Sequence, residues 1–152
     1  MTPWWVVAGC ALVMGVVGHL TGQQLATGGY RIPEDEAEHA VGRNWWPGLL
    51  CGALSAVAAL AVGDLAGWAA LPAYLLFAWL TVGLIWIDLD VHRLPRLLTW
   101  PAYPAFAVLL ALCSWAADDW AALGRAVEAA AASWLFFYVL HWLSRRSLGR
   151  GD

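Results

Sequence analysis

The sequence predicts an all-α fold, a polytopic membrane helix bundle with about five transmembrane helices. The chain is 62% hydrophobic and only 12% charged, whereas an average globular domain has about 25% charged residues. Its apolar runs approach the roughly 20 residues that cross a bilayer. Lipid offers the backbone no hydrogen-bond partner, and no run shows barrel-like alternation, so each span should be helical. We expect residues 1–152 to form a single membrane domain.

The apolar runs define the expected spans, which are Trp4–Leu20, Pro47–Gly63, Trp68–Ile87, Trp100–Ala117 and Ala121–Leu143. In the second span, Gly48 and Gly52 form a GxxxG spacing that permits close approach of another helix. Thr99 is expected to cap the fourth span just ahead of Pro101. Tryptophans near the ends of the runs suit the headgroup level, and these are Trp4, Trp5, Trp45, Trp46, Trp100 and Trp142.

The first loop, Gly22–Trp46, is expected to be irregular or only briefly helical, because glycine and proline interrupt it. It also carries an acidic run, which is either a solvated linker, the interpretation we favour, or a substrate-binding patch. The run consists of Glu34, Asp35, Glu36 and Glu38.

The arginines predict the topology. All eight basic residues are arginine, and seven of them fall in the first loop, the third loop and the tail, whereas Arg125 stands alone on the other side. Positive charge concentrates in cytoplasmic loops. The chain is therefore expected to be a multi-pass protein of the inner (cytoplasmic) membrane, with its N-terminus outside and its C-terminus in the cytoplasm.

Composition also limits the possible partners and cofactors. The net charge is −3, and no basic face suggests nucleic-acid binding. Cys10, Cys51 and Cys113 all lie inside apolar runs without a CxxC pair or a histidine at ligand spacing. We therefore predict that the cysteines are small core or lipid-facing residues and that they form no metal site.

Two acidic residues, Asp88 and Asp90, end the third span in the string Trp86-Ile87-Asp88-Leu89-Asp90-Val91-His92-Arg93-Leu94-Pro95. Two residues turn a helix by roughly 200°, so only one of the two can face a given bundle interior. Asp88 and His92 share a face, and Pro95 limits how far the helix continues. By itself this pattern fits either a solvated interfacial helix end or a catalytic site.

The tail contains a second acidic motif, Gly149-Arg150-Gly151-Asp152. Its glycines allow open backbone conformations that bring a carboxylate close to a neighbouring segment. The motif is weak when taken alone. It becomes more specific when paired with the Asp88 segment, because both are expected on the cytoplasmic side.

The segment Asp88–Thr99 followed by a GxGD string resembles the type IV prepilin leader peptidase family, membrane aspartic peptidases of the GxGD type. The resemblance implies that Asp88 and Asp152 are catalytic and that no metal or other cofactor is needed. It implies a prepilin or pseudopilin leader peptide as substrate, cut at the cytoplasmic face. The implied supporting residues are Asp90, His92, Arg93, Pro95, Gly149 and Gly151.

This chain departs from the family pattern in two ways. Many bacterial members carry paired CxxC motifs near the N-terminus that are linked to N-methylation, and the first loop here has no cysteine. Members also continue past GxGD into further helices, so we expect a C-terminally truncated member. The alternative function is that of an inactive or truncated membrane paralogue acting as a non-enzymatic assembly or transport subunit.

Chemically, two close carboxylates in a partly dry site share one proton. The ionised group can activate water while the protonated group polarises the scissile carbonyl. The sequence does not assign the acid and base roles between Asp88 and Asp152.

Overall fold

The computed structural model describes residues 2–31, 44–65, 67–92 and 96–143. The predicted all-α fold is confirmed, because every regular element in these ranges is a helix and none is a strand. A short 3-10 helix, η1 (Trp68–Ala70), leads into α3. The α-helices are α1 (Trp4–Leu25), α2 (Trp46–Leu65), α3 (Leu71–Val91), α4 (Arg96–Ala117) and α5 (Trp120–Leu143).

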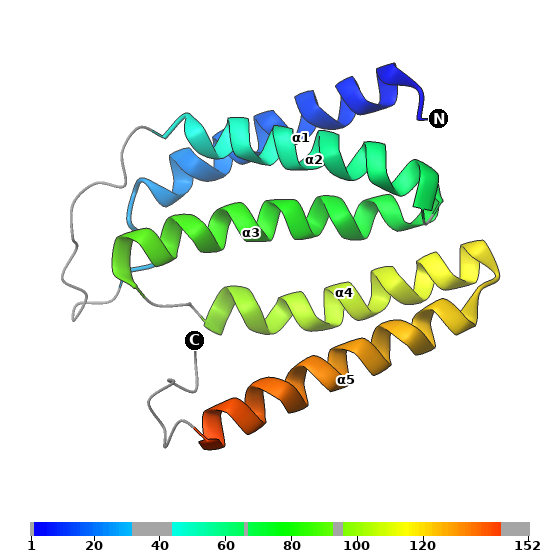
Figure 1. Ribbon diagram of the computed structural model, residues 1–152. Coiled ribbons are helices and arrows are strands. Elements are labelled where there is room, and N and C mark those ends of the chain that lie inside the picture. Colours follow the sequence, from blue (N-terminus) through cyan, green and yellow to red (C-terminus); the bar gives the residue numbers. More distant parts are fainter. Residues whose placement is uncertain (1, 32–43, 66, 93–95, 144–152) are drawn as a thin grey trace.

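The helices run up and down, so that successive helices are antiparallel (Figure 1). The ends of α1, α3 and α5 therefore lie at one end of the bundle, together with the starts of α2 and α4 (Figure 1). Among the residues that the structure describes, four helices are long and apolar enough to cross a membrane, whereas the apolar stretch of α2, Trp46–Val62, is shorter. These lengths and compositions are those of a multi-pass membrane protein.

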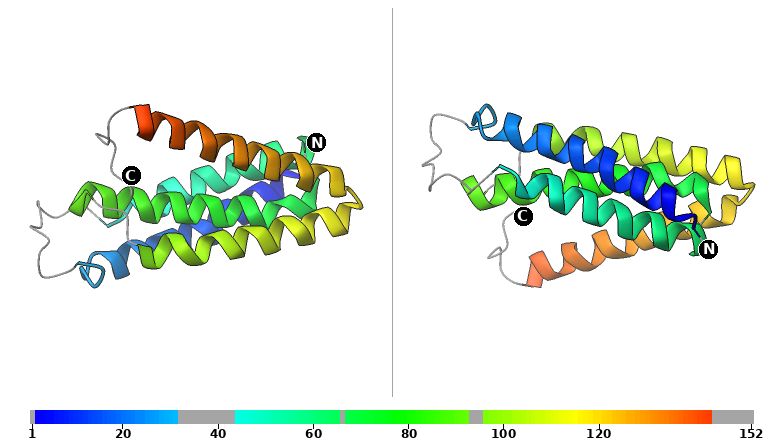
Figure 2. Two further views of the ribbon diagram at one scale, coloured as in Figure 1. Left: turned by 90° about the horizontal axis from the view of Figure 1, so that it is seen from below. Right: turned by 90° about the horizontal axis from the view of Figure 1, so that it is seen from above.

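The core lies among α1, α2 and α3. Its buried side chains come mainly from α2 and α3, for example Cys51, Val62, Val82 and Trp86. By contrast, α5 has no buried residue, and its C-terminal half diverges from the other helices (Figure 2). In a bilayer, most of α5 would therefore face lipid or another protein.

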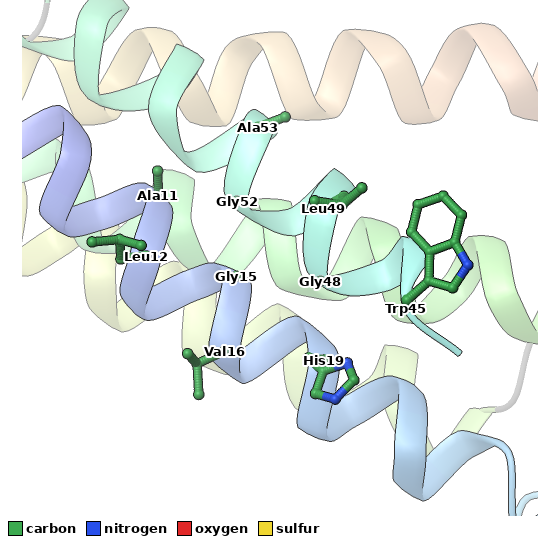
Figure 3. A pocket seen from close by; sticks show the side chains of 10 residues that line it. All are labelled: Ala11, Leu12, Gly15, Val16, His19, Trp45, Gly48, Leu49, Gly52 and Ala53. Atoms are coloured by element: carbon green, nitrogen blue, oxygen red, sulfur yellow. The ribbon is translucent and has the colours of Figure 1, made fainter. Parts of the chain in front are cut away.

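Glycines allow α1 and α2 to cross in close contact (Figure 3). A methyl group added at Gly18 would lie 2.6 Å from Cys51 Cβ. One added at Gly48 would lie 2.9 Å from the Gly15 carbonyl oxygen. This confirms the close approach predicted from the glycine spacing in α2.

Several helix ends differ from the expected ones. Helix α1 continues to Leu25, into the segment expected to be a loop. Helix α4 begins at Arg96, so the prediction that Thr99 caps this helix is wrong. The Thr99 hydroxyl instead donates to the Arg96 carbonyl at 3.4 Å. The helix tolerates Pro101 in its interior, because a membrane helix can satisfy the freed carbonyl through neighbouring groups.

Candidate functional site

The candidate site lies where α3 ends. His92 has a left-handed backbone (φ 48°) and its N–H donates to the Asp88 carbonyl oxygen at 2.9 Å. A residue in this conformation stops a helix while satisfying one of its last carbonyl groups. The carboxylates of Asp88 and Asp90 therefore belong to the last helical turn, at the same end of the bundle as the ends of α1 and α5 (Figure 1).

Asp90 is buried, and both of its carboxylate oxygens accept hydrogen bonds. It is only 1% exposed. Arg31 Nε lies 2.7 Å from its Oδ2, and Arg31 Nη2 lies 2.7 Å from its Oδ1. The Tyr30 hydroxyl donates to Oδ2 at 2.5 Å. Paired bonds from one guanidinium to both oxygens combine charge neutralisation with a fixed orientation.

A turn after α1 brings Tyr30 and Arg31 to Asp90. Gly28 has φ 72°, a left-handed conformation that favours glycine. The Arg31 N–H then donates to the Gly28 carbonyl at 3.0 Å. The Arg31 side chain packs back over this turn, since a methyl group at Gly28 would lie 3.3 Å from Arg31 Nη1.

Aromatic contacts hold the same part of α3 against α1 and α2. Trp86, one turn before Asp90, is 3% exposed. Its ring stacks on that of Trp46 at the start of α2, with centroids 5.5 Å apart. Two turns earlier, the Trp79 indole N–H donates to the Thr21 hydroxyl of α1 at 2.8 Å. One side of α3 thus contacts both preceding helices.

The network shifts the pKa values of Tyr30 and Arg31, which lie in the turn after α1. Burial, and then the hydrogen bond to Asp90, raise the pKa of Tyr30 above its ordinary value, against a smaller opposing effect of the Trp86 indole. The hydrogen bond to Asp90 also raises the pKa of Arg31. Tyr30 is thereby kept as a neutral donor and Arg31 as a cation.

Asp88 has the opposite environment from Asp90. Its side chain is exposed, as are those of Leu89 and His92. The prediction that Asp88 and Asp90 lie on opposite faces is therefore confirmed, and the structure shows that Asp90 is the residue facing the bundle. An exposed carboxylate at a helix end is free to act on a substrate or to pair with a second carboxylate.

The other predicted site residues lie outside the described part of the chain. These are Asp152 and the supporting residues Arg93, Pro95, Gly149 and Gly151. Helix α5, which precedes the GxGD string, ends at Leu143, at the same end of the bundle as Asp88 (Figure 1).

Sequence reasoning missed the roles of Tyr30, Arg31 and Trp46. The sequence pattern links Arg31 only to topology and Trp46 only to the headgroup belt. One signal could have suggested the pairing: a carboxylate that faces a bundle interior needs a cation or several donors, and Arg31 lies on the same predicted side as Asp90. Nothing in the local sequence connects the two, because they are 59 residues apart.

A separate groove of about 540 Å³ lies between α1 and α2 (Figure 3). Its lining is apolar except for His19, whose ring nitrogen lies 3.1 Å from Gln23 Nε2. The groove includes neither Asp88 nor Asp90. Within the described ranges, no group of three or more His, Cys, Asp or Glu side chains is placed to hold a metal ion.

No family model matches the chain, and neither a curated protein nor a solved structure matches it. A functional assignment therefore depends on the residues and their geometry.

Proposed function

We propose that this protein is a membrane-embedded aspartic endopeptidase that cleaves the leader peptide of type IV prepilins or pseudopilins at the cytoplasmic face. The observation that carries the proposal is the contrast at the end of α3. Asp90 is neutralised by Arg31, whereas Asp88, the residue that matches the family's first catalytic aspartate, has an exposed side chain.

Asp152 is proposed as the second carboxylate. Helix α5 ends at the same end of the bundle as Asp88 (Figure 1), and nine residues, 144–152, lead from Leu143 up to and including Asp152. Nine residues reach at most roughly 30 Å when extended. The GxGD resemblance supplies the reason to pair Asp152 with Asp88.

The proposed reaction needs one proton shared by the two carboxylates. The ionised carboxylate takes a proton from water, and the resulting nucleophile attacks the scissile carbonyl carbon. The protonated carboxylate donates to the carbonyl oxygen and stabilises the charge that develops there. Breakdown of the tetrahedral intermediate returns a proton to the leaving amine, and the pair regains its starting state.

The proposed orientation places Asp88 at the cytoplasmic face. The arginines of the first loop, the third loop and the tail support it. The apolar segment that follows a prepilin cleavage site would then lie in the membrane beside the bundle, with the scissile bond at the level of the last turn of α3.

The proposal is tested by the removal of the leader from a co-expressed prepilin, which is detected as a change in electrophoretic mobility. We expect Asp88→Asn and Asp152→Asn each to abolish cleavage, since neither the acid nor the base can be spared. Asp118→Asn is the matched control, because it alters an exposed carboxylate between α4 and α5, at the opposite end of the bundle. Cleavage by Asp88→Asn at the parent rate would refute the proposal.

A non-enzymatic assembly subunit is the second candidate, and one observation favours it. Helix α5 buries none of its residues, and its aromatic side chains, including Trp134, Phe136 and Phe137, are exposed. Such a helix suits packing against another membrane protein. If this candidate is correct, pilus assembly should continue in the Asp88→Asn variant. It should be lost when these α5 aromatics are replaced by leucine.

A further inference from the structure

We propose that Arg31 is a positioning residue for the reaction at Asp88, an inference that rests on the proposed function. Arg31 fixes the rotation of the last turn of α3 by holding Asp90, and this rotation determines that Asp88 points out of the bundle. Arg31 itself acts through Asp90 and touches no substrate.

The first step of the argument is the geometry of the pair. The two 2.7 Å contacts join two nitrogens of one planar group to two oxygens of another. Such a bidentate pair resists rotation, whereas a single contact would act as a pivot. Because the Asp90 carboxylate is on a short side chain, this restraint extends to the α3 backbone.

The second step is that Arg31 is itself held in place. Its backbone N–H is bonded to the Gly28 carbonyl, and Tyr30 contacts the same carboxylate of Asp90 from the adjacent position. The pair therefore connects α3 to an ordered turn at the end of α1 and not to a freely moving side chain.

The third step concerns the face of α3. Trp86 and Asp90 are four residues apart and occupy the same side of the helix, where Trp86 stacks on Trp46. Asp88 lies between them in sequence and roughly 200° away from Asp90 around the helix. Loss of the Arg31 contact would leave the last turn held by the single hydrogen bond from Tyr30 to Asp90 and by Trp86, one turn further from the helix end.

The two carboxylates therefore have different roles. Asp90 serves to orient the helix, whereas Asp88 is the group available for chemistry. A shift of about 1 Å in a catalytic group can cost about 100-fold in rate, so a change confined to Arg31 is expected to affect turnover at Asp88.

Cysteine labelling measures the rotation of α3 without reference to activity. Ile87 is 2% exposed and Leu89 is 54% exposed. In full-length protein with its native cysteines replaced by alanine, Leu89→Cys should react with a maleimide much faster than Ile87→Cys. Adding Arg31→Gln should bring the two labelling rates towards equality. Arg125→Gln is the matched control, because it removes the exposed pair with Asp119 (3.5 Å) at the other end of the bundle.

Prepilin cleavage measures the effect on the reaction. We expect Arg31→Gln to lower kcat by roughly 100-fold with little change in KM, because substrate contacts remain and only the catalytic group is misplaced. Arg125→Gln should match the parent. The proposal would be overturned if Arg31→Gln changed neither the two labelling rates nor kcat. It would also be overturned if Arg31→Gln changed the labelling rates while kcat stayed at the parent value.

A second variant covers the case in which Arg31→Gln is not recovered in the membrane. Arg31→Lys keeps the charge but cannot form the bidentate contact. Labelling rates at positions 87 and 89 that are closer to equality than in the parent, together with a lowered kcat, would support the inference. Parent values of the labelling rates and of kcat would overturn it. The two proposals can fail separately. If the parent protein leaves prepilin uncut, the proposed function falls and with it the positioning role, whereas labelling still reports whether Arg31 fixes the rotation of α3.

Discussion

Asp88 and Asp90 lie two residues apart in the last turn of α3 and have opposite surroundings. Asp90 is 1% exposed and bound by Arg31, whereas the Asp88 side chain is exposed. Helical geometry separates their directions by roughly 200°. One carboxylate therefore serves the packing of the bundle, and the other remains accessible at its end.

The first prediction concerns the crossing of α1 and α2. Gly18→Ala should lower the free energy of unfolding by about 1–3 kcal/mol, the usual effect of overpacking. The reason is that the added methyl group would lie 2.6 Å from Cys51 Cβ and 2.7 Å from the Pro47 carbonyl oxygen. Thermal or denaturant unfolding of the detergent-solubilised protein would measure the change.

Gly9→Ala is the matched control for this substitution in the same helix. A methyl group at Gly9 meets nothing within 4 Å. The change should be neutral, or stabilising by up to about 1 kcal/mol, because alanine loses less conformational entropy in a helix. Equal destabilisation by the two substitutions would contradict the close crossing.

The second prediction concerns topology. Ala26 follows α1 and Ala116 lies near the end of α4, at opposite ends of the bundle, and both are exposed. In protein without native cysteines, a membrane-impermeant maleimide added to intact cells should label Ala116→Cys. It should label Ala26→Cys only after permeabilisation. The reverse pattern would show that the arginine bias was misread.

The third prediction concerns alkaline pH. Burial and the hydrogen bond to Asp90 raise the pKa of Tyr30, so folding favours the neutral phenol. The resulting stability is fully present below the unfolded pKa of about 10 and is lost as pH rises through the folded pKa. The thermal stability advantage of the parent over Tyr30→Phe should therefore shrink above about pH 10.

Thermal midpoints measured from pH 8 to pH 11 would test this third prediction, with pH values chosen around the ordinary tyrosine pKa of about 10. Tyr103→Phe provides the comparison, because it removes a hydroxyl from a side chain that is 75% exposed. If the difference in thermal midpoint between the parent and Tyr30→Phe stays constant over this range, the Tyr30 proton is not linked to folding.

The class of fold and the approximate positions of the helices follow from the apolar runs of the sequence. Residues such as those of Trp120–Leu143 form a long apolar run, and an apolar segment in lipid must satisfy its own backbone hydrogen bonds. The relative direction of Asp88 and Asp90 also followed from sequence, since it depends only on helical periodicity. The close approach at Gly48 followed from glycine spacing alone.

Which of the two aspartates faces the bundle depends on how the helices pack together. Periodicity fixes the angle between side chains but not the rotation of a helix about its own axis, and the third span is apolar on all sides, so no hydrophobic stripe fixes that rotation. The rotation depends on partners far away in sequence: Arg31, 59 residues before Asp90, and Trp46, which stacks on Trp86. Such contacts form only when the helices pack together, because they join separate helices and the turn that follows the first.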